Sequence, residues 1–128
     1  MAFFDFLKNK TIPVYQDRIA KNPDDAEAHF LLGVQYEHEG ETDKAISAFE
    51  EVVRLNPRSA ETLFNLAQLH NLKNNGPMAI RYITQAGNLF SQKNDSENKD
   101  RARKLLREYH LRFKDSVGTA SLPTGNAE

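Results

Sequence analysis

A repeat of 34 residues constrains the fold of this 128-residue chain more than any other feature of its sequence. Asn22-Pro23 recurs as Asn56-Pro57, and small residues coincide at Gly33 and Ala67. A repeat of this length predicts one helical unit that is used twice. The identities at this offset pair Ala26 with Ala60, Glu27 with Glu61, Phe30 with Phe64, Leu32 with Leu66, Ala45 with Ala79, Ile46 with Ile80 and Leu55 with Leu89.

The first unit is predicted to be two helices joined by a short turn. Asp25 is an N-cap residue for a helix that runs to about Glu39, and Gly40 supplies the left-handed stop. Thr42 or Asp43 begins a second helix, which ends before Pro57. The apolar positions of this second helix follow helical spacing, and they are Ala45, Ile46, Phe49, Val52 and Val53.

The second unit repeats this organisation with different turn residues. Ser59 is the expected cap of a helix to about Lys73, and Asn74-Asn75-Gly76 is the expected turn. Pro77 begins the next helix at a position that needs no amide hydrogen. A helical hairpin cannot bury its apolar stripe alone, so stacking on neighbouring helices is required. The inner face of the last helix consists of Ala79, Ile80, Ile83 and Ala86.

These residues resemble the tetratricopeptide repeat (TPR) family, whose 34-residue unit is a helix-turn-helix. The resemblance covers residues 26–90 and implies an all-α helical-hairpin repeat solenoid with two full TPR units flanked by capping helices. The first unit matches the signature positions of the family at Leu32, Gly33, Tyr36, Ala45, Phe49 and Pro57. The departures are His29 and Leu63 at positions where the family often has tryptophan, His70 in place of tyrosine, and Ser91 in place of proline.

The domain organisation follows from this register. Residues 1–23 are expected to be an N-terminal capping segment with a degenerate half-repeat, in which residues 11–21 form a helix and residues 2–7 form a short helix or an extended plug. Residues 24–91 hold the two repeats, 26–59 and 60–93 in register. Residues 92–115 are a C-terminal capping helix, preceded by a loop and helix start over 91–100, and residues 116–128 are a disordered tail. The apolar face of the capping helix comprises Ala102, Leu105, Leu106, Tyr109 and Phe113.

The sequence carries no pattern of catalytic chemistry, so we expect no enzyme activity, no cofactor and no metal. The chain has no cysteine, and its four histidines include no i, i+4 pair. No glycine-rich phosphate loop is present, and a net charge of −1 makes nucleic acid an improbable partner. No stretch approaches the roughly 18 consecutive apolar residues of a membrane span, and no signal peptide is evident, so a soluble cytoplasmic protein is expected.

The resemblance also implies where a partner binds, because the first helix of each TPR unit lines the concave face. Phe30, Val34 and Phe64 would then form an apolar strip rimmed by acidic residues, suited to a protein or peptide with apolar and basic residues. Two alternatives stay open: Phe3, Phe4 and Phe6 fill the strip, or these rings belong to the core between repeats. The carboxylate clamp of chaperone-binding members is not expected, since only Asn65 of it is present. The predicted partner-binding residues are Glu27, Phe30, Val34, Glu37, His38, Glu61, Phe64, Asn65, Gln68 and Asn71.

Charge is distributed unevenly along the chain. Residues 24–61 carry ten acidic and three basic residues, whereas residues 93–114 carry eight basic and four acidic ones. The basic stretch is either a solvated helix face or a docking face for another copy, an acidic partner, nucleic acid or anionic lipid. The residues of this possible docking face are Arg101, Arg103, Lys104 and Arg107.

The sequence therefore predicts a non-catalytic TPR adaptor or scaffold that binds a protein or peptide partner on its concave face. The alternative is a structural or assembly subunit that self-associates head-to-tail or clamps a larger complex.

Overall fold

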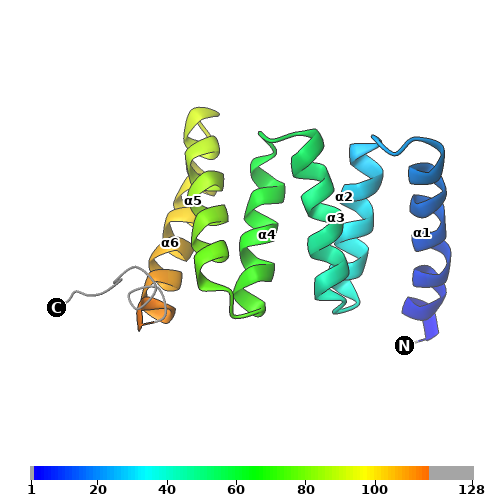
Figure 1. Ribbon diagram of the computed structural model, residues 1–128, viewed down its shortest axis with the longest axis horizontal. Helices are drawn as coiled ribbons and strands as arrows, with labels where there is room; N and C mark the ends of the chain where they lie inside the picture. Colours follow the sequence, from blue (N-terminus) through cyan, green and yellow to red (C-terminus); the bar gives the residue numbers. More distant parts are fainter. Residues whose placement is uncertain (1, 116–128) are drawn as a thin grey trace. The chain divides into compact units, whose positions relative to one another are not determined.

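The computed structural model describes the backbone of residues 2–115 and the side chains from residue 11 onward (Figure 1). Over this range the chain forms six α-helices and no strand, so the all-α prediction is confirmed. The chain divides into two compact units, one up to Thr62 and one from Leu63. The predicted tail, 116–128, lies outside the described residues. The helices are α1 (Ala2–Lys21), α2 (Ala26–His38), α3 (Thr42–Leu55), α4 (Ala60–Leu72), α5 (Gly76–Gln92) and α6 (Ser96–Arg112).

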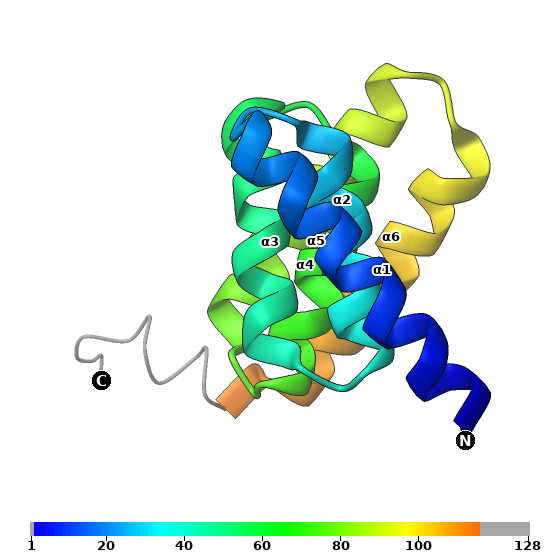
Figure 2. The same cartoon turned by 90° about the vertical axis from the view of Figure 1, so that its right-hand side faces the viewer.

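Helix α1 is longer than the sequence pattern predicted. Residues 2–7 are neither an extended plug nor a separate short helix, because one helix continues from Ala2 to Lys21. This helix contains Pro13, whose missing amide hydrogen removes one hydrogen bond from its interior. Helix α1 packs on α2 (Figures 1 and 2). It covers apolar surface of α2 that the hairpin of α2 and α3 would leave exposed on its own.

Helices α2 and α3 form the hairpin predicted for the first unit. The Asp25 carboxylate accepts a hydrogen bond of 3.0 Å from the Ala28 amide, and Gly40 ends the helix region with a φ of +75°. The close approach of the two helices depends on Gly33, because a Cβ added there would lie 2.7 Å from the Phe49 ring. The spacing correctly indicated the buried positions 45, 49 and 52 of α3, but it missed the buried Ala48, and Ile46 and Val53 are only half-buried.

The turn between α4 and α5 differs in detail from the prediction. The left-handed residue is Asn74, with a φ of 59°, and Gly76 is the first residue of α5. The Asn75 side chain caps this helix by accepting a hydrogen bond of 3.2 Å from the Met78 amide. Gly76 is required for a different reason, since a Cβ there would lie 2.6 Å from the Phe113 ring.

Helix α5 extends further than its counterpart α3. Helix α3 ends at Leu55, two residues before Pro57, whereas α5 passes the equivalent Leu89 and ends at Gln92. Ser91, which replaces the proline, has an amide hydrogen and permits the helix to continue. Asn94 then takes a φ of 60°, and the predicted loop and helix start over 91–100 consists of the end of α5, a short turn and the first residues of α6.

Helix α6 covers α5 in the second unit. Asp95 caps α6 by accepting a hydrogen bond of 3.2 Å from the Asn98 amide. Of the predicted apolar face, the residues at 102, 109 and 113 are buried, and those at 105 and 106 are half-buried. Desolvation raises the pKa of the Tyr109 phenol, and the negative charge of Glu108 adds to this shift. In the described part of the chain, no helix combines the length and apolarity needed to span a bilayer.

Candidate peptide-binding site

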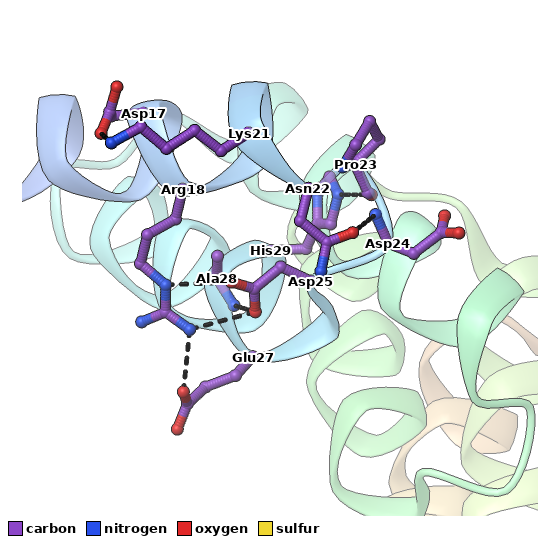
Figure 3. Close-up of polar contacts among 10 residues, drawn as sticks. All are labelled: Asp17, Arg18, Lys21, Asn22, Pro23, Asp24, Asp25, Glu27, Ala28 and His29. Carbon is purple, nitrogen blue, oxygen red and sulfur yellow. Dashed lines mark hydrogen bonds and ion pairs between the residues drawn. The ribbon is translucent and has the colours of Figure 1, made fainter.

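A polar cluster fixes the N-terminal end of α2 against α1 (Figure 3). Arg18 of α1 donates two hydrogen bonds of 3.0 Å to the carboxylate of Asp25 and one of 2.9 Å to Glu27. The hydrogen bonds from Arg18 lower the pKa of the Asp25 carboxyl, and the bond from the Ala28 amide lowers it further. Glu27, a predicted partner-binding residue, is therefore paired within its own unit.

His29 occupies a position where the family often has tryptophan, and here its ring contacts the loop that precedes α2. Its Nε2 atom lies 2.9 Å from the carbonyl oxygen of Pro23 (Figure 3), and 9% of the residue is exposed. The ring thus fixes the loop between α1 and α2.

The other predicted residues of α2 lie on one side of that helix. Phe30 is half-buried, with its ring centroid 5.5 Å from that of Phe49, and Val34 is half-buried one turn later. Burial raises the pKa of the Glu37 carboxyl, with a smaller opposing effect from the nearby His38. His38 itself is exposed. This face of α2 therefore combines apolar surface with acidic groups.

The equivalent residues of α4 are in a different environment. Phe64 is only 6% exposed, because its ring packs edge-on against Phe90 at a centroid distance of 6.4 Å. The Arg101 guanidinium covers the same ring at 4.9 Å. Phe64 is thus a core residue of the second unit and presents little surface to a partner. Glu61 is exposed, and Asn65 and Gln68 are partly exposed.

Asn71, the last predicted residue of α4, is engaged by α6. Arg112 donates a hydrogen bond of 2.9 Å to the Asn71 carbonyl oxygen and contacts the side-chain oxygens of Asn71 and Asn74. These contacts fix the end of α4 to the end of α6.

The structure contains a groove that the sequence reasoning missed. This groove, the α1–α3 groove, lies in the first unit between α1, α2 and α3 and has a volume of about 570 Å³. Its apolar lining is supplied by Ile19, Leu32 and Ala48, together with the ring of Tyr36. The Lys44 ammonium lies 5.7 Å from the centroid of that ring, a cation–π contact at the edge of the groove.

The groove opens on the opposite face of α2 from the predicted binding residues. At 100° per residue, the groove-lining positions 29, 32 and 36 point roughly 150° away from positions 27, 30, 34 and 37. The signal that could have revealed it is the pair Ile12 and Ile19, seven residues apart, which marks an apolar side of the helix before the first repeat.

The four basic residues predicted on α6 differ in their surroundings. Arg101 packs on Phe64 and donates a hydrogen bond of 2.8 Å to Asn98, so it is engaged within its unit. Arg103, Lys104 and Arg107 are exposed. Among the side chains that the structure describes, those of residues 11–115, no group of three or more histidine or carboxylate side chains gathers in a way that could hold a metal ion.

Residues 26–59 match the sequence model of the tetratricopeptide repeat family. This segment is a tetratricopeptide repeat. The match covers the TPR hairpin of α2 and α3 and the turn that follows it. No curated protein matches the sequence at a significant level.

Solved TPR-type structures resemble the chain over most of its length. The type III secretion translocator chaperone SycD of Yersinia enterocolitica has a TM-score of 0.76 at 20% identity, covering 88% of this chain and 81% of SycD. PcrH, solved with the chaperone-binding region of PopD, has a TM-score of 0.75 at 16% identity, covering 87% and 81%. The TPR2B domain of yeast Sti1, solved as a complex with pHsp70, has a TM-score of 0.74 at 13% identity, covering 86% and 88%. These likenesses show the helical-repeat fold.

Proposed function

We propose that this chain is a non-catalytic TPR adaptor that binds a peptide segment of a protein partner. The observation that carries the proposal is the α1–α3 groove, whose volume of about 570 Å³ lies within the range of roughly 300–1,000 Å³ of ligand sites. The peptide complexes of PcrH and of the Sti1 TPR2B domain support this function by fold analogy.

The chemistry of the groove favours a peptide with apolar and basic residues. Ile19, Leu32 and Ala48 offer apolar surface to an anchoring side chain, and the walls carry the carboxylates of Asp43 and Glu51. The surrounding residues 24–61 are strongly acidic, with ten acidic and three basic side chains. The acidic residues would therefore attract a basic peptide as it approaches, and burial of its apolar side chain in the groove would hold it once bound.

The predicted concave lining remains a second candidate for the same function, and each unit is considered by itself. The set on α2 consists of Glu27, Phe30, Val34, Glu37 and His38. The set on α4 consists of Glu61, Asn65, Gln68 and Asn71, with Phe64 in the core beside them. The α2 set and the α1–α3 groove use opposite faces of α2, so they can be tested separately.

A pair of tryptophan substitutions distinguishes the two surfaces. Peptides are first selected from a random display library against the full-length protein, and their affinities are measured by fluorescence polarisation. Ser47→Trp places a large ring in the α1–α3 groove, and His38→Trp places the same ring on the opposite side of α2; both positions are exposed, so neither change disturbs the core. Weakening of about tenfold or more by Ser47→Trp alone supports the groove.

The reverse pattern assigns binding to the predicted concave lining. If neither substitution affects any selected peptide, or no peptide is selected, the adaptor proposal is wrong for these surfaces. Light scattering at two salt concentrations tests the alternative of an assembly subunit. Copies held together by charge would dissociate near 1 M salt, where the screening length falls from about 10 Å at 0.1 M to about 3 Å.

A further inference from the structure

A second, smaller groove lies in the second unit between α5 and α6. This α5–α6 groove has a volume of about 180 Å³. Its apolar lining includes Ile83, Ala102 and Leu106, and the cationic side chains of Lys99 and Arg103 border it on α6. It therefore combines an apolar floor with positive charge, which is the opposite charge to that of the α1–α3 groove.

No acidic side chain lines this groove. Helix α5, which forms the other wall, contains no acidic residue. Lys99 and Arg103 form no ion pair with any residue that the structure describes. These two residues are one helical turn apart, and like charges at this spacing repel each other. A bound anion would relieve that repulsion.

The size of the groove indicates what kind of anion fits. A volume of about 180 Å³ is below the roughly 300–1,000 Å³ typical of sites for free small molecules, so it suits one side chain of a larger ligand. Gly87 lines the groove without a side chain and lies close to the Ala102 methyl carbon, which a Cβ at position 87 would approach to 3.5 Å. On the α5 wall, the amide of Asn88 and the hydroxyl of Ser91 can donate hydrogen bonds to carboxylate oxygens.

We propose that the α5–α6 groove binds an acidic peptide segment of a protein partner. One apolar side chain of the peptide lies between Ile83 and Leu106, and flanking carboxylates pair with Lys99 and Arg103. A nucleic acid fits this surface less well, since the groove offers no aromatic ring on which a base could stack and the chain has a net charge of −1. The proposal is independent of the α1–α3 groove, which favours basic peptides.

The test uses a defined probe and two variants of equal charge. The probe is a fluorescein-labelled synthetic peptide of glutamate and aspartate residues around one central leucine, titrated with the full-length protein at low salt. Lys99→Gln combined with Arg103→Gln removes two charges at the groove. Lys104→Gln combined with Arg107→Gln removes two charges from the same helix at positions that do not line it. We expect the first pair to weaken binding roughly tenfold or more and the second less than about twofold.

Three results would overturn the proposal. Equal weakening by both variant pairs would show only a general attraction to a basic helix. Unchanged affinity after replacement of the central leucine by serine in the probe would show that the apolar floor is not used. Tighter binding of a single-stranded oligonucleotide of the same charge, lost in the Lys99 and Arg103 variant, would assign the groove to nucleic acid. Circular dichroism melts confirm that each variant is folded, and Ser47→Trp, which blocks the α1–α3 groove, should leave this probe's affinity unchanged.

Discussion

The same substitution, glycine to alanine, should have opposite effects on stability at two helical positions of this chain. At Gly33 the new Cβ would lie 2.7, 2.8 and 3.0 Å from three atoms of the Phe49 ring. Phe49 is fully buried and has Phe30 beside it, so its ring has little room to move. At Gly87 the nearest atom would be the Ala102 methyl carbon at 3.5 Å, which is an ordinary contact.

The expected free energies follow from two opposing effects. Alanine favours a helix interior over glycine by about 1 kcal/mol, and overpacking of a core costs about 1–3 kcal/mol. Because three ring atoms are in the way, the cost at Gly33 should be near the upper limit. We expect Gly33→Ala to destabilise the protein by about 1–2 kcal/mol and Gly87→Ala to stabilise it by up to about 1 kcal/mol. Each kcal/mol corresponds to a change in melting temperature of roughly 4 °C.

Far-UV circular dichroism is the appropriate assay, because the chain contains no tryptophan for a fluorescence measurement. Thermal and urea unfolding of both variants are compared with wild type. Phe49→Leu should cost less in the background of Gly33→Ala than alone, because the smaller side chain relieves the contact. If both glycine variants change stability in the same direction by the same amount, the packing argument for Gly33 is refuted.

Three further predictions follow from the described contacts. Glu37→Gln should raise the melting temperature at neutral pH, because burial raises the pKa of this carboxyl in the folded protein. Wild-type stability is then lost as the pH rises above the pKa of the unfolded chain, about 4.3, so the gain of the variant should vanish at lower pH. Glu50→Gln, at an exposed position, is the control. Arg18→Met should destabilise the protein at neutral pH, because Arg18 lowers the pKa of Asp25 in the folded protein. The stability that this interaction contributes is present above the unfolded pKa of Asp25, about 3.9, and is lost as the pH falls through its folded pKa. The melting temperatures of the variant and the wild type should therefore converge in acid. Ending the chain after Gln92 removes α6 and should leave a fragment that binds the dye ANS and lacks a cooperative transition; cooperative unfolding at the full-length temperature would contradict this role of α6.

The helices of the repeats were predictable because their end signals are local. Asp25 and Asn75 cap their helices through their own side chains, and Pro57 ends α3 by its covalent structure. The length of α1 was not predictable in this way. Pro13 interrupts the local helical pattern, and the helix is fixed by distant contacts such as that of Arg18 with α2.

The candidate site was less predictable than the fold. Phe30 and Phe64 are identical residues at equivalent positions, yet Phe30 is half-buried and Phe64 is covered. Phe64 is covered by the ring of Phe90 and by the Arg101 guanidinium of α6, whereas the ring beside Phe30 is that of Phe49. The α1–α3 groove likewise depends on a helix before the repeats. A periodic sequence thus predicts which residues are equivalent, but non-repeated neighbours determine which of them a partner can reach.

Ser91 affects where the helix after the second repeat begins. By letting α5 run past the point where α3 stops, it delays the next helix, so α6 begins two residues later than a third copy of the unit would. Two residues rotate a helix by about 200°, which moves the polar side of α6 to where a buried side would be needed. The positions that α4 buries at 63, 66, 67 and 70 correspond, 34 residues later, to the exposed Glu97, Asp100, Arg101 and Lys104. Helix α6 therefore does not repeat α4 in the 34-residue register, and it caps the second unit with a buried side of its own at Ala102 and Tyr109.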